Sequence, residues 1–131
     1  MTQHTPSFTG LLLAALMSVC TSADQTSQLS NVMREKLGHS QAILGAVVTS
    51  DWAALDRESR ALALAVRDPV WGAALTNPEY LRQSDAFNRA LQDLIEASVK
   101  MDLEAAGNAQ IMLTASCVRC HLQRSRRRTA N

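Results

Sequence analysis

Residues 85–101 read DAFNRALQDLIEASVKM, and apolar side chains recur along this stretch at helical spacing. Positions three and four apart share one face of an α-helix, so the stretch predicts an amphipathic helix. Ser84 precedes it and can cap its N-terminus. The apolar stripe of this helix consists of Phe87, Leu91, Leu94, Ile95 and Val99.

Three further stretches favour helices. Residues 30–49 carry an apolar stripe, with Glu35, Lys36 and Gln41 placed elsewhere around the helix. That stripe consists of Val32, Met33, Leu37, Leu44, Val47 and Val48. Residues 52–67 and 103–124 follow Asp51 and Asp102, and aspartate is a preferred N-cap residue. Their apolar positions are Leu55, Leu62 and Val66 in the former and Ala106, Leu113, Cys117 and Cys120 in the latter.

The composition and the connections indicate one helical domain. The chain has 131 residues, enough for a single domain, with 47% hydrophobic and only 4% aromatic residues. Two of the three connections, near Ser50 and Asp102, are very short, which makes neighbouring helices antiparallel. We therefore expect an all-α protein: an antiparallel up-down-up-down four-helix bundle.

The connection over residues 68–83 is longer than the other two, and Asp68-Pro69 is expected to end the helix before it. Asn77-Pro78 indicates a turn, and the segment also holds Trp71 and Tyr80. Both aromatic rings could plug one end of the bundle core. Alternatively, Trp71 could lie against a bound planar ligand.

The N-terminus resembles an export signal. Residues 11–19, LLLAALMSV, are too few to span a bilayer and suit the apolar region of a secretory signal peptide. Thr21-Ser22-Ala23 fits a cleavage site, so we expect residues 1–23 to be removed and 24–131 to form the mature periplasmic domain, with no transmembrane span. A lipid anchor on Cys20 is the less favoured alternative.

The pentapeptide Cys117-Val118-Arg119-Cys120-His121 carries the chemistry. In an exported protein, C-x-x-C-H indicates covalent attachment of c-type haem. On a helix, Cys117, Cys120 and His121 share one face, so two thiols can bond the porphyrin vinyl groups while the imidazole reaches the iron. We expect one haem c, held through the two cysteines, with His121 as an axial ligand.

Other interpretations of the two cysteines are weaker. A disulfide between Cys117 and Cys120 would be strained inside a helix. A thioredoxin-like redox pair needs a βαβ unit, which the helical pattern lacks. Zinc would need four ligands, and only the distant His39, more simply a histidine at the surface or rim, could complete the set.

A C-x-x-C-H motif on the last of four helices resembles the cytochrome c′ family, the class II c-type cytochromes. Val32–Trp52 is similar to the family's first helix, and Trp71–Ser98 to a subgroup of small exported members. The resemblance implies a haem-binding bundle that is often a homodimer. Family members commonly have Arg or Lys four residues beyond the histidine, where this chain has Ser125, so Arg124 or Arg126 would pair with a haem propionate instead.

The first helix must supply the distal side of such a haem, and Met33 lies on its apolar stripe. The stretch from Val32 resembles the methionine-ligated, low-spin branch of the family, whose sixth iron ligand matches Met33. This implies an electron carrier that cycles between Fe2+ and Fe3+ and is not an enzyme. If Met33 is only a core residue, a five-coordinate haem that binds NO or CO is the alternative, and a haem-free interaction bundle is the third.

Charge is distributed unevenly. Residues 1–118 hold 8 Lys/Arg against 12 Asp/Glu, a net of −4, and residues 119–131 hold five arginines and no acid, a net of +5. The arginines can interact with the C-terminal helix dipole, neutralise haem propionates or steer an acidic redox partner protein. Nucleic-acid binding is excluded because the body is acidic and no aromatic residues are interleaved with the arginines.

Overall fold

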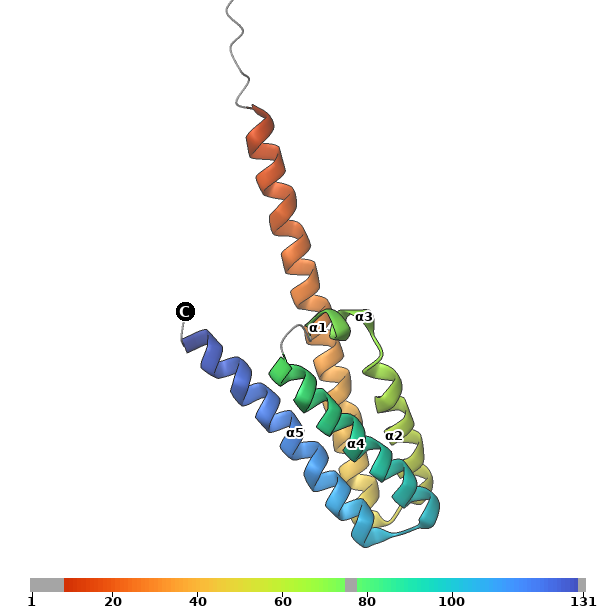
Figure 1. The fold of residues 1–131 in the computed structure, drawn as a ribbon. Helices are drawn as coiled ribbons and strands as arrows, with labels where there is room; N and C mark the ends of the chain where they lie inside the picture. Colours follow the sequence, from red (N-terminus) through yellow and green to blue (C-terminus); the bar gives the residue numbers. More distant parts are fainter. Residues whose placement is uncertain (1–8, 75–77, 130–131) are drawn as a thin grey trace, which may run out of the picture.

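A computed structural model describes residues 9–74 and 78–129, and the side chains of 24–72, 78–126 and Thr129. The described residues form five helices and no strand, so the expected all-α class is confirmed for them. Figure 1 shows the four long helices side by side as a bundle, with the short α3 at one end. The helices are α1 (Thr9–Thr49), α2 (Trp52–Ala65), α3 (Pro69–Ala74), α4 (Pro78–Lys100) and α5 (Leu103–Thr129).

Helix α1 is longer than the sequence pattern predicts. It begins at Thr9 instead of near Ser30, and its N-terminal half projects beyond the other helices (Figure 1). Alanine, leucine and methionine are strong helix formers, which explains why the helix continues through residues 11–17. Residues 9–23 of the expected signal segment therefore lie on the same helix as Met33, although their side chains are outside the described ones.

The turns after α1 and α4 have the same construction. Ser50 and Met101 adopt left-handed backbone conformations, with φ of 55° and 53°. The amide that follows each of them donates to a carbonyl five residues earlier, at Ala46 and Ala97, over 2.9 and 3.0 Å. This is the Schellman arrangement, which satisfies the last carbonyls of a helix and reverses the chain within two residues.

An aspartate then starts the next helix at both turns. The Ala54 amide donates to the Asp51 carboxylate over 2.9 Å, and the Ala105 amide donates to Asp102 over 3.0 Å. The two predicted caps are therefore confirmed. Each tight turn joins two neighbouring helices at one end of the bundle.

The segment over residues 68–83 is not the loop that the sequence pattern suggests. Helix α3 fills its first part, and α4 begins at Pro78, so Ser84 lies inside a helix and caps nothing. Proline suits the first position of a helix, which explains both starts, at Pro69 and Pro78. Helix α2 ends at Ala65, before the expected stop at Asp68-Pro69. Asp68 instead caps α3, because its carboxylate accepts from the Val70 amide over 2.8 Å. Asn77 lies outside the described residues.

The apolar core is built by all four long helices. It uses most of the predicted positions of α2, α4 and α5, but Val99 on α4 is 70% exposed. Val48 on α1 is also exposed, at 74%. On α1, Ile43 takes the core position that the periodicity assigns to Leu44, which is half exposed. The largest fully buried apolar side chains are Ile43, Leu55, Leu62, Leu94 and Leu113.

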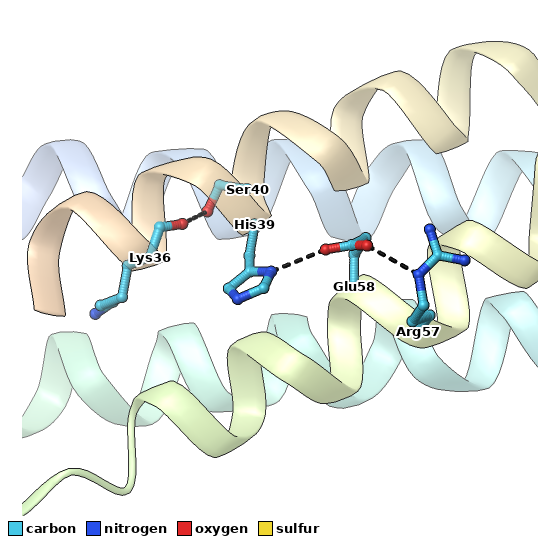
Figure 2. Close-up of polar contacts among 5 residues, drawn as sticks. All are labelled: Lys36, His39, Ser40, Arg57 and Glu58. Atoms are coloured by element: carbon cyan, nitrogen blue, oxygen red, sulfur yellow. Dashed lines mark hydrogen bonds and ion pairs between the residues drawn. The ribbon is translucent and has the colours of Figure 1, made fainter.

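A polar contact joins α1 to α2. The His39 ring lies 2.8 Å from the Glu58 carboxylate through Nδ1, and Arg57 holds the other Glu58 oxygen at 3.0 Å (Figure 2). An ionised carboxylate only accepts, so Nδ1–H of His39 is the donor. The hydrogen bonds from His39 and then Arg57 lower the pKa of Glu58.

Replacing Met101 by glycine should stabilise the bundle. Glycine adopts φ near 53° without the Cβ clash that methionine suffers, and Met101 is 65% exposed, so little packing is lost. We expect the free energy of unfolding to rise by about 1 kcal/mol in denaturant titrations. Met101→Ala is the control and should give no gain. A glycine variant no more stable than the alanine variant would show that the left-handed conformation of Met101 costs nothing.

Glu58→Gln should destabilise the protein in a pH-dependent manner. The pKa of Glu58 is lowered in the fold, so its carboxylate stabilises the native state above the unfolded pKa of about 4.3, and this contribution is lost as pH falls. At pH 7 we expect a loss of about 0.5–1 kcal/mol that shrinks toward zero below pH ~4. Thermal melts at pH 7 and below pH ~4 test this expectation. Glu96→Gln, at an exposed position, is the control. A loss that is equal at both pH values would refute the assignment.

Candidate functional site

The three residues of the C-x-x-C-H motif lie on α5. Cys117 and Cys120 are half-buried free thiols, and His121 is exposed. One helical turn separates the two sulfur-bearing residues, so both thiols and the imidazole lie along one side of α5. Burial raises the pKa of the Cys120 thiol, while the nearby Lys36 opposes this increase.

A cavity of about 290 Å³ lies beside the motif. Four helices contribute to it: α1, α3, α4 and α5. It brings together all four candidate site residues, with Met33 on α1 and Cys117, Cys120 and His121 on α5. Its walls are largely apolar and include Leu37 and Leu44, which explains why these two members of the α1 stripe lie outside the core. Its volume is close to the lower bound of roughly 300 Å³ for small-molecule sites.

A second hollow of about 200 Å³ adjoins this cavity. Met33, Trp71, Cys120 and His121 line both spaces, and the second is completed by Leu29, Tyr80 and Arg124. Of the two arginines considered for a haem propionate, Arg124 lines this hollow and Arg126 lines neither space. The side chains of Arg127 and Arg128 lie outside the described ones.

Trp71 is buried and belongs to the cavity wall. It is 8% exposed, comes from α3 and lies apart from the main apolar cluster of the bundle. Of the two roles that the sequence leaves open, plugging the core or facing a ligand, its position in the wall favours the second. Whether the Trp71 ring contacts a ligand depends on which molecule binds in the cavity.

Lys36 is the residue whose place the sequence does not reveal. The periodicity puts it away from the apolar stripe of its helix, but it is 9% exposed and lines the cavity. Its Nζ lies 3.7 Å from the centre of the Trp71 ring and 4.3 Å from that of Phe87. Burial lowers the pKa of Lys36 to about 8, against the opposing influence of Cys117 and Cys120.

Two glutamines add polar atoms to the wall. The side-chain oxygens of Gln83 and Gln110 are buried, and neither has a hydrogen-bond partner among the described residues. Gln110 is 7% exposed, and its amide nitrogen makes one long contact, 3.4 Å, to the Thr114 hydroxyl. Buried polar atoms are normally paired, so these groups indicate that the cavity suits a ligand with polar groups as well as an apolar body.

His39 lies elsewhere. It is hydrogen-bonded to Glu58 between α1 and α2 (Figure 2). It does not line the cavity that the two thiols line. The histidine that the sequence offers to complete a zinc site is therefore not beside Cys117 and Cys120. Among the side chains that the structure describes, no group of three or more His, Cys, Asp or Glu is placed to hold a metal ion.

Comparison with known proteins gives no family: no family model, curated protein or solved structure matches this chain. None of the helices, over their described residues, is long and apolar enough to cross a membrane. The geometry of the cavity is therefore the basis for any functional conclusion.

Proposed function

We propose that this chain is an exported c-type cytochrome of the cytochrome c′ type, which carries one haem c and acts as an electron carrier. One observation supports this most: two thiols, an imidazole and a thioether, from Cys117, Cys120, His121 and Met33, line a single apolar cavity. The proposal includes the up-down-up-down arrangement of the four long helices, which the short turns at Ser50 and Met101 favour.

The residues present fit a haem group. Cys117 and Cys120 would hold it through thioether bonds, and His121 would be an axial ligand. When bound, haem supplies a reversible one-electron couple, Fe2+/Fe3+. The chain contributes apolar side chains to the cavity walls, among them Leu37 and Leu44, and apolar surroundings lower the local dielectric constant.

Met33 is proposed as the second axial ligand. It comes from α1, whereas the motif comes from α5, and residues of both line the same cavity. A planar group bound between these helices would therefore meet imidazole from one helix and thioether sulfur from the other. A His/Met pair tends to raise the reduction potential, which suits electron transfer.

Binding of a gas such as NO or CO is the second candidate function. Leu37 lies one turn after Met33 and lines the same cavity. If this apolar side chain covers the distal side, the iron stays five-coordinate and can bind a small neutral ligand. The spin state separates the two functions.

Location and partners complete the proposal. Residues 1–23 would direct the chain to the periplasm and be removed after Ala23, with acylation of Cys20 as the alternative. The partners would be redox proteins, and the arginines after His121 would contact acidic groups on them. A homodimer would agree with the resemblance to the cytochrome c′ family.

The intact mass of the exported protein tests covalent attachment. In a host with haem-attachment machinery, we expect the mass of residues 24–131 plus one haem, retained after denaturation. Cys117→Ala or Cys120→Ala should leave attachment through one thioether bond, and the double variant should lose it. The mass of the bare polypeptide would refute the proposal, and a chain that starts at Met1 or an acylated Cys20 would refute the processing.

Replacing Met33 by leucine tests the sixth ligand. If the thioether binds iron, its ferric charge-transfer band at the red end of the visible spectrum disappears, the spin state rises and the ferrous form binds CO faster. Met112→Leu is the matched control because Met112 is half exposed on α5 and lines neither hollow beside the motif. A wild-type protein that is already high-spin, or an unchanged spectrum in Met33→Leu, would favour gas binding instead.

A further inference from the structure

Lys36 places a cationic group in a largely apolar cavity. The residue is 9% exposed, and among the described residues no acidic side chain lies within ion-pair distance of its Nζ. Figure 2 shows the ammonium directed away from Glu58, the acid on the neighbouring helix. Glu58 is engaged by His39 and Arg57 instead.

Two aromatic rings hold the ammonium where it is. Trp71 from α3 and Phe87 from α4 lie 3.7 and 4.3 Å from Nζ, within the range of cation–π attraction. Ring faces stabilise a cation but do not neutralise it, and lysine is almost never fully buried without a partner. An anion that enters the cavity would supply the partner that Lys36 lacks among the described residues.

The surrounding groups suit a carboxylate. Gln110 lines the same cavity with an unpaired oxygen, and rotation of its amide would present N–H donors instead. Among the side chains that the structure describes, no Asp or Glu lines the cavity to compete for Lys36. Arg124 lines the adjoining hollow and is placed for a second negative group.

We propose that the ligand of this cavity is anchored by a carboxylate that pairs with Lys36, beside Trp71 and Phe87. This inference rests on the proposed function for the identity of the ligand: with haem, the carboxylate is a propionate. Lys36 is then a positioning residue that also sets the potential. Ferric haem carries one more positive charge than ferrous haem, so a cation beside it, or one that neutralises a propionate, disfavours the ferric state.

The midpoint potential of the haem-loaded protein tests the pairing. Lys36→Met keeps the length of the side chain and removes its charge, which leaves the propionate unneutralised and favours the ferric state. We expect the ferrous-to-ferric ratio at fixed potential to fall about tenfold, equivalent to about 59 mV for a one-electron couple. Lys36→Arg should retain most of the wild-type potential, and the exposed Lys100→Met should leave it unchanged.

The absorption spectrum of the same variants identifies other roles of Lys36. Pairing with a propionate predicts an unchanged spin state in Lys36→Met. An unchanged midpoint potential in Lys36→Met would overturn the proposal. A changed spin state in the same variant would also overturn it, because it would indicate that Lys36 is an iron ligand. If Lys36→Met does not fold, Lys36→Gln provides the neutral variant.

Failure of the proposed function would be recognised separately. A wild-type chain without haem would refute the cytochrome assignment but not the anion site. The full chain would then be titrated with protoporphyrin IX and with its dimethyl ester, using tryptophan fluorescence. Stronger binding of the free acid, with the preference lost in Lys36→Met, would support the anion site, and equal binding would overturn it.

Discussion

The bundle depends on packing that is complete at one end and hollow at the other. The tight turns at Ser50 and Met101 bring the helices together, and fully buried residues such as Ile43, Leu55 and Leu94 fill the space next to them. Farther from the turns, α1 and α5 diverge around the cavity that Met33 and the C-x-x-C-H motif line (Figure 1). A bundle with apolar packing at one end can keep a ligand-sized space at the other and still fold.

The cavity is apolar in its walls and charged at one point. The Lys36 ammonium is held by Trp71 and Phe87, on two other helices, so this cation links α1, α3 and α4 around the space. Desolvation costs a buried ammonium several kcal/mol, and cation–π contacts return only about 2 kcal/mol. The balance favours an anionic ligand, and on the proposed function this residue contributes both to affinity and to potential.

Local features of this chain can be predicted from its sequence, and packing can be predicted only in part. The caps at Asp51 and Asp102 are predicted by residue type, although Ser84, predicted in the same way, caps nothing. The motif at residues 117–121 is recognised by its spacing. Periodicity defines a helix face only to within about a quarter turn. It does not show that Ile43 enters the core while its neighbour Leu44 faces the cavity.

Two features of the structure are not predicted by the sequence pattern. Lys36 has the sequence character of a surface residue, and only the rings of Trp71 and Phe87 reveal why it is buried. The start of α4 at Pro78 escapes prediction because asparagine before proline normally indicates a turn, and the helical residues after it carry no clear apolar stripe before Phe87. The signal that could reveal the buried cation is a lysine on one predicted helix, together with Phe87 on another and Trp71 in the connection between helices.

Haem attachment is the central claim, and a pyridine haemochrome spectrum tests it most directly. The exported protein is first extracted with acidified acetone, which removes haem that is not covalently bound, and the spectrum is then recorded on the precipitated chain. We expect a c-type spectrum, with both vinyl groups saturated, equivalent to one haem per chain. A precipitate without haem, or haem recovered entirely in the acetone, would contradict it.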